Sequence, residues 1–158
     1  MRLDSITISS PEVGRCNSFI YCIYICEPQG LVYIGETRSE YGALGRLSGH
    51  MQAEQGTFIK KCIDKNINID EVRCDINMLA FNLSDYPEYC GELNNSNRRA
   101  LEYFVHGCME EYSVDDKTVI PFDVVSWTTI ASRLSDNENI YELAEKIARE
   151  FYEKIPFH

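Results

Sequence analysis

Five side chains in the sequence have the chemical types that cleavage of a phosphodiester bond requires. They are Tyr24, Tyr33, Arg46, His50 and Glu102. An arginine can bind two phosphate oxygens at once, and its charge favours the deprotonated form of a nearby phenol. A histidine exchanges protons near neutral pH, and a glutamate is a hard oxygen ligand for Mg²⁺ or Mn²⁺. Brought together, these groups could activate a water molecule, bind the phosphate and hold a metal ion.

The two tyrosines lie on segments that predict an antiparallel hairpin. Residues 19–26 and 31–35 are rich in aromatic and β-branched side chains, and a short turn with proline and glycine separates them. Side chains on one face of such a pair stand close together. We therefore expect Tyr24 and Tyr33 to be neighbours.

The other three residues lie on predicted helices. Apolar residues recur at helical spacing over residues 43–54 and again over 98–112. Arg46 and His50 are four positions apart on the first helix, so they share a face. Glu102 lies on the second helix.

The whole pattern predicts a small α+β domain. We expect a small antiparallel sheet of three or more strands flanked by helices, with an additional C-terminal helix. The remaining predicted elements are a helix at residues 58–65, strands at 72–81 and 122–130, and an amphipathic helix at 139–154.

The order of these motifs resembles that of the GIY-YIG nuclease family. The family carries Gly-Ile-Tyr on a first strand, Tyr-Ile-Gly on a second, an arginine followed one helical turn later by histidine or tyrosine, and a glutamate on a later helix. The first glycine of the family is replaced here by a cysteine. The matching pieces span residues 21–102 and are Cys22-Ile23-Tyr24, Tyr33-Ile34-Gly35, Arg46 with His50, and Glu102.

The resemblance implies a metal-dependent endonuclease that uses Mg²⁺ or Mn²⁺. Glu102 would be the metal ligand, Arg46 would bind the phosphate, and the tyrosines and His50 would surround the attacking water. Which group removes the proton from that water is left open. Nucleic acid would be the substrate, DNA rather than RNA, and the expected substrate contacts are Gly35, Lys60 and Lys61.

The resemblance also divides the chain. Residues 1–18 form an N-terminal extension, residues 19–112 the nuclease-like domain, and residues 113–158 a C-terminal extension packed on the same domain. The compact members of the family have shorter connections, so we expect insertions near 38–42 and 82–97.

Charge supports a second interpretation. The net charge is −10, and residues 101–158 alone hold 12 acidic against 5 basic side chains. Nucleic acid is bound mainly through lysine and arginine, so an acidic surface fits a protein partner better. The alternative is an inactive binding or regulatory module on the same fold, with a homodimer or another protein docked on the acidic C-terminal region.

Composition also indicates the compartment. The seven cysteines include no C-x-x-C pair, which argues against a zinc site and favours reduced thiols. The first residues lack the features of a signal peptide, and no apolar run is long enough for a bilayer. We expect a cytoplasmic protein without membrane contact.

Each residue taken singly has a simpler interpretation. Glu102 could form a helical ion pair with Arg98 or Arg99, which precede it by four and three positions. His106 has no recognisable partner and is expected to be structural or exposed to solvent. Trp127 is expected in the core rather than as a platform for stacking bases.

Overall fold

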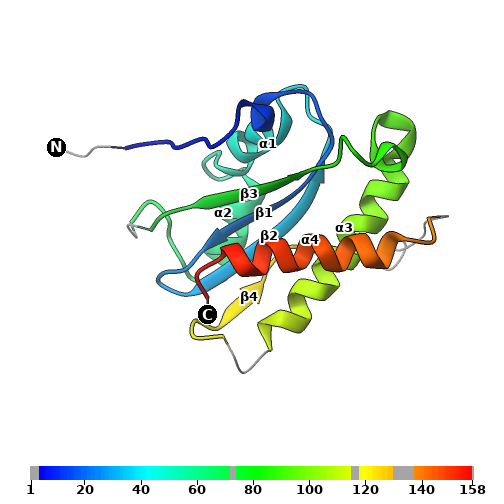
Figure 1. Ribbon diagram of the computed structural model, residues 1–158. Coiled ribbons are helices and arrows are strands. Elements are labelled where there is room, and N and C mark those ends of the chain that lie inside the picture. Colours follow the sequence, from blue (N-terminus) through cyan, green and yellow to red (C-terminus); the bar gives the residue numbers. More distant parts are fainter. Residues whose placement is uncertain (1–3, 72–73, 115–117, 130–136, 158) are drawn as a thin grey trace.

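The computed structural model describes residues 4–71, 74–114, 118–129 and 137–157. Its centre is a four-stranded sheet in the order β3–β1–β2–β4 (Figure 1). Strand β1 pairs antiparallel with β2 on one side and with β3 on the other, while β4 runs parallel to β2. The strands are β1 (Phe19–Ile25), β2 (Gly30–Thr37), β3 (Asn77–Asn82) and β4 (Phe122–Val124).

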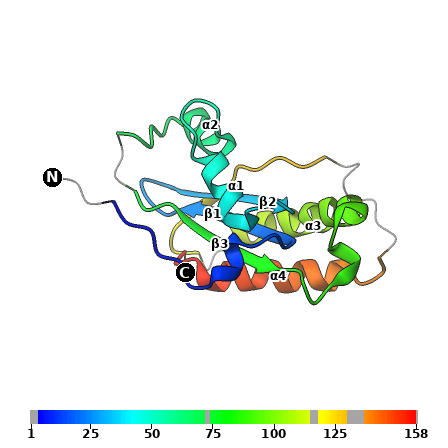
Figure 2. The ribbon, with the colours of Figure 1, turned by 90° about the horizontal axis from the view of Figure 1, so that it is seen from above.

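Two pairs of helices cover the two faces of the sheet (Figure 2). Helices α1 and α2 lie on one face, and α3 and α4 lie on the other. The stripe Ile140, Leu143, Ile147 and Phe151 makes α4 amphipathic, and all four side chains are buried. The bounds are α1 (Gly42–His50), α2 (Thr57–Asp64), α3 (Asn95–Ser113) and α4 (Ile140–Lys154).

Strand β1 separates two hydrophobic cores. All seven of its residues are buried, which explains its continuous apolar sequence. Ile20 and Cys22 point toward α3 and α4, whereas Tyr21 and Ile23 point toward α1 and α2. Because successive side chains of a strand alternate between faces, this register decides which tyrosine can reach which helix.

The predicted fold class is confirmed at the level of an α+β protein with a small sheet flanked by helices. The sheet is mixed rather than purely antiparallel, because β4 pairs in parallel with the edge of β2. The segment between β3 and α3, predicted as a loop, contains two short 3-10 helices, η2 (Pro87–Tyr89) and η3 (Glu92–Asn94).

Several predicted boundaries shift. The strand expected at 72–81 is β3, which starts at Asn77, and residues 72–73 lie outside the described part. Only the first three residues of the strand expected at 122–130 pair in the sheet, and residue 130 is not described. Among the described residues, no helix is both long and apolar enough to cross a membrane.

Candidate functional site

Four side chains meet next to Gly35, on the face of the sheet that α1 and α2 cover. The ring centroid of His50 lies 4.7 Å from that of Tyr33 and 5.6 Å from that of Tyr21. The hydroxyl oxygen of Tyr21 is 2.8 Å from Nε2 of His50. Arg46 lies one turn before His50 on α1. The positive charge of Arg46 and a hydrogen bond from its side chain both favour the deprotonated form of Tyr21. The structure thus brings together three predicted residues, Tyr33, Arg46 and His50.

Tyr24 does not belong to this group, because it lies on the opposite face of the sheet. It pairs across the hairpin with Val32, the chain neighbour of Tyr33, so the two tyrosines point in opposite directions. Tyr24 packs in the core under α3 and α4, where its ring centroid is 6.4 Å from that of Phe157. The prediction that Tyr24 and Tyr33 share a face is wrong. Tyr21, which sequence reasoning missed, stands beside Tyr33 instead.

Gly35 makes room for the ring of Tyr21. The two residues are cross-strand partners, and a Cβ atom on Gly35 would lie 2.3 Å from both Cζ and the hydroxyl oxygen of Tyr21. No side chain fits between the strand and the ring. Gly35 therefore has a packing role here, and its contact with a substrate stays a prediction.

His50 is held neutral and almost fully enclosed. His50 is only 2% exposed, and Nδ1 of its ring has no hydrogen-bond partner among the described residues. Burial, and then the charge of Arg46, lower the pKa of His50 to about 4. Since Arg46 favours negative charge on the Tyr21 oxygen, the hydroxyl of Tyr21 is best placed to donate its hydrogen to Nε2.

The two tyrosines differ in access to solvent. Tyr21 is 1% exposed, whereas Tyr33 is only partly buried. Burial raises the pKa of both phenols above the ordinary value, and the charge of Arg46 opposes that rise in each. Tyr33 and the exposed Arg46 are therefore the groups of this cluster that are most accessible to a ligand from solution.

Glu102 approaches the same place from α3. Its charge contributes to the raised pKa of Tyr33, second to burial, so the carboxylate and the phenol interact across the edge of β2. Burial, and then the charge of Glu36, raise the pKa of Glu102 to about 8, although Arg99 and Arg46 lower it. Tyr33, Arg46 and Glu102 thus interact electrostatically with one another, and Arg46 also interacts with His50.

The surroundings of Glu102 fit a divalent cation. No hydrogen bond joins its carboxylate to the described residues, and the nearby carboxylate of Glu36 repels it. A bound cation would offset the energetic cost of burying the Glu102 carboxylate and would reduce its repulsion by Glu36. The described residues contain no group of three or more His, Cys, Asp or Glu side chains suited to a metal. An ion here would have Glu102 as a protein ligand and would take its other oxygens from water and substrate, as Mg²⁺ commonly does.

Arg98 anchors the connection that leads into α3. It is 1% exposed, and its Nε lies 3.0 Å from a carboxylate oxygen of Glu36. It also donates hydrogen bonds to the carbonyl oxygens of Tyr89 and Gly91, at 3.0 and 2.6 Å. Arg98 therefore does not pair with Glu102, because it is bound to Glu36 and the backbone, whereas the charge of Arg99 does act on Glu102 and lowers its pKa.

The two predicted substrate lysines lie on the helix that packs against Tyr33. Phe58 of α2 has its ring centroid 6.4 Å from that of Tyr33. On the same helix Lys60 is exposed and Lys61 is half-buried, and neither forms an ion pair with the described residues. Lys65, by contrast, pairs with Asp123 at 3.0 Å.

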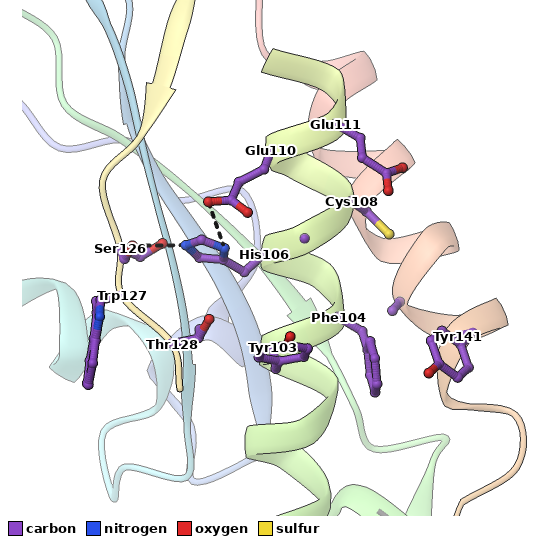
Figure 3. Close-up of a pocket in the computed structure, with 12 residues that line it drawn as sticks. Tyr103, Phe104, His106, Cys108, Glu110, Glu111, Ser126, Trp127, Thr128 and Tyr141 are labelled. Atoms are coloured by element: carbon purple, nitrogen blue, oxygen red, sulfur yellow. Dashed lines mark hydrogen bonds and ion pairs between the residues drawn. The ribbon is translucent and has the colours of Figure 1, made fainter. Parts of the chain in front are cut away.

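A further link joins α3 to β2 behind the site. His106 is buried, and its Nε2 lies 2.9 Å from the carbonyl oxygen of Ser126 (Figure 3). The hydroxyl of Ser126 accepts a hydrogen bond of 3.0 Å from the amide of Ile34. Of the two roles expected for His106, the structure supports the structural one, and it also supplies a partner that the sequence did not reveal. Trp127, expected in the core, is 75% exposed.

Comparison of the chain with models of protein families, with curated proteins and with solved structures found no match. The case for a function therefore depends on the site alone.

Proposed function

We propose that the chain is a metal-dependent endonuclease of the GIY-YIG type, which hydrolyses phosphodiester bonds in nucleic acid, with DNA as the expected substrate. The observation that carries the proposal is the convergence of Tyr21, Tyr33, Arg46, His50 and Glu102 on one edge of β2. These residues come from four separate elements, and packing alone does not require this combination of a cation, an acid and a hydrogen-bonded phenol–imidazole pair.

Arg46 is the residue suited to the phosphate. Its guanidinium is exposed and can donate two parallel hydrogen bonds to phosphate oxygens. A phosphodiester bound there would partly neutralise the charge that helps to keep the pKa of His50 low. Substrate binding would thereby make the imidazole a better proton acceptor.

The proton of the attacking water would leave through the Tyr21–His50 pair. The Tyr21 oxygen takes the proton from water while its own hydroxyl hydrogen passes to Nε2 of His50, 2.8 Å away. The water oxygen would then bond to phosphorus as the bond from phosphorus to the leaving oxygen breaks. The leaving oxygen would keep the electron pair and take up a proton from solvent, and His50 would release its proton to solvent. Tyr33, the more accessible phenol, orients the water.

Glu102 would hold the Mg²⁺ or Mn²⁺ ion. When bound, such an ion supplies positive charge that stabilises the pentavalent transition state and the leaving oxygen. The half-buried carboxylate of Glu102 contributes an oxygen ligand for which no competing hydrogen bond from the described residues exists.

A cleavage assay tests the proposal. Purified protein is incubated with plasmid, single-stranded DNA and RNA, each with Mg²⁺, with Mn²⁺ or with EDTA, beside the Glu102→Ala variant. We expect cleavage that requires both the metal and Glu102. Full activity of the Glu102→Ala variant would refute the assignment of the site.

The acidic surface favours a second candidate, an inactive binding module. The net charge is −10, and in addition Tyr21 and His50 are almost fully enclosed in the protein. A module of this kind would bind a basic protein and cleave nothing. Stable capture of a defined basic partner, together with no metal-dependent cleavage of any substrate, would favour it over the nuclease.

A further inference from the structure

An aromatic cavity lies beside the proposed site, between α3 and the chain that follows β4. Its volume is about 400 Å³, and it is open to solvent. Tyr103, Phe104 and Tyr141 line it from the helices, and Trp127 belongs to the chain at the opposite rim, where its ring lies on the outer side of that chain, away from Tyr103 (Figure 3). The proposed reaction uses none of these four side chains.

Trp127 is exposed but its backbone is fixed in place. The preceding residue, Ser126, accepts a hydrogen bond from the amide of Ile34 at 3.0 Å and contacts Nε2 of His106 at 2.9 Å through its carbonyl oxygen. Ile34 stands between Tyr33 and Gly35 on β2. The indole is therefore presented at the strand edge next to the proposed site, by a segment that β2 and α3 both hold.

The cavity and the metal-ligand position are about one helical turn apart. Glu102 and His106 are four residues apart on α3 and share a face, which corresponds to roughly 6 Å along the helix axis. This is the scale of a single nucleotide, whose base and phosphate are joined through one sugar. A phosphate at Arg46 and Glu102 would thus leave its base, or the adjacent base, within reach of this cavity.

The charge of the cavity suits a base and not a phosphate. Glu110 and Glu111 line it, and no lysine or arginine is among the described residues that do. Glu110 is 59% exposed and can accept hydrogen bonds from the exocyclic amino groups of a base. An uncharged aromatic ring with amino groups is therefore the part of a nucleic acid that this cavity can accept.

We propose that Trp127 stacks on an unpaired base of the strand that is cut, with the base lying on the exposed indole ring at the rim of the cavity. This inference rests on the proposed nuclease function and specifies its substrate as a single strand, or a duplex from which a base has been extruded. Stacking of a base on an aromatic side chain is tolerant of sequence, so recognition would depend on the absence of pairing.

Trp127 is the only tryptophan of the chain, which makes the inference directly measurable. We would titrate Glu102→Gln protein in EDTA, where cleavage is blocked, and record the tryptophan emission. The probes are a single-stranded oligodeoxynucleotide, its blunt duplex, and a strand of equal length built from stable abasic units. We expect the single strand to quench the emission, while the abasic strand, with the same charge but no bases, leaves it unchanged.

Three variants measure the contribution to affinity through the anisotropy of a labelled single strand. Trp127→Ala should weaken binding about 5- to 150-fold, and Trp127→Phe, which can still stack, by no more than about threefold. Val119→Ala removes an equally exposed apolar side chain away from the cavity and should leave affinity unchanged.

The outcomes separate this inference from the nuclease assignment. Equal quenching by the abasic strand, or binding of the single strand without any change in emission, would overturn the stacking while leaving the nuclease assignment intact. Failure of every strand to bind, together with the absence of cleavage, would overturn both.

Discussion

Substitution of Gly35 by alanine tests the packing that places Tyr21 in the site. A Cβ atom at this position would lie 2.3 Å from the Tyr21 ring, and ordinary contact begins at 3.4 Å, so the ring has to move by about 1 Å. Overpacking of this kind costs about 1–3 kcal/mol. If the ring moves away from His50, the buried Nε2 loses its partner, which adds roughly 1–3 kcal/mol. We therefore expect Gly35→Ala to lower the free energy of unfolding by about 2–6 kcal/mol.

Urea unfolding measures this change, and the chain offers a matched control. Gly49 lies within α1, and a Cβ added there would meet nothing within 4 Å. Gly49→Ala should raise stability by about 0.5–1 kcal/mol, because alanine loses less backbone entropy in a helix. The two glycine substitutions are thus expected to have opposite signs.

A double-mutant cycle identifies the cause. In a Tyr21→Ala background the ring is gone, so the additional effect of Gly35→Ala should fall to within about 0.5 kcal/mol of zero. If Gly35→Ala destabilises the protein equally with and without the Tyr21 ring, or does not destabilise it at all, the reasoning about this pair is refuted.

Two further predictions concern the tyrosines and His50. In a cleavage assay, Tyr21→Phe should lower the rate by about 10²- to 10⁴-fold, because it removes the oxygen that carries the proton. Tyr24→Phe changes a side chain on the opposite face of the sheet and should stay within about threefold of the parent rate. Equal effects of the two substitutions would contradict the placement of the tyrosines. Because the pKa of His50 is lowered from 6.5 to about 4 on folding, its neutral form contributes stability that is present above pH 6.5 and is lost as the pH falls toward 4, by roughly 3 kcal/mol in all. Urea unfolding across this range should show that slope in the parent and a much flatter one in His50→Gln, and parallel profiles would refute it.

Individual strands and helices were predictable because the composition and spacing of neighbouring residues indicate them. The apolar run of β1 and the stripe of α4 each indicate their element through composition and period. The start of α3 was placed too late, at residue 98, because Asn97 is typical of a helix cap but already lies in the helix, which begins at Asn95. Nothing local indicated that β4 would pair in parallel with β2, since that contact joins segments about 90 residues apart.

The error at Tyr24 has a specific physical origin. In a hairpin the number of residues in the turn sets the register, and a change of one position moves a side chain to the other face. The structure pairs Tyr21 with Gly35, so odd-numbered residues of β1 share a face with Tyr33. The signal that could have found Tyr21 was the glycine of the second strand, since a ring can lie across a glycine and not across a larger residue.

Tertiary contacts determine the rest of the site. That Glu102 would meet Tyr33 depends on how α3 crosses the sheet edge, and its raised pKa depends on Glu36. Likewise, helical spacing offered Glu102 two possible partners, Arg98 and Arg99, and the ion pair of Arg98 with Glu36 leaves only Arg99 to act on it. The exposure of Trp127 follows from the point at which its segment stops pairing with β2, which composition does not reveal.

The most direct test of the account is the rate of Mg²⁺-dependent cleavage by Glu102→Gln, measured beside Glu150→Gln. Both substitutions replace a carboxylate by a neutral amide of nearly the same shape, and Glu150 is exposed on α4, outside the site. The account predicts that Glu102→Gln lowers the single-turnover rate by about 10²-fold or more, because the metal ligand is lost, while Glu150→Gln cleaves at the parental rate. A Glu102→Gln protein that cleaves as fast as Glu150→Gln would contradict it.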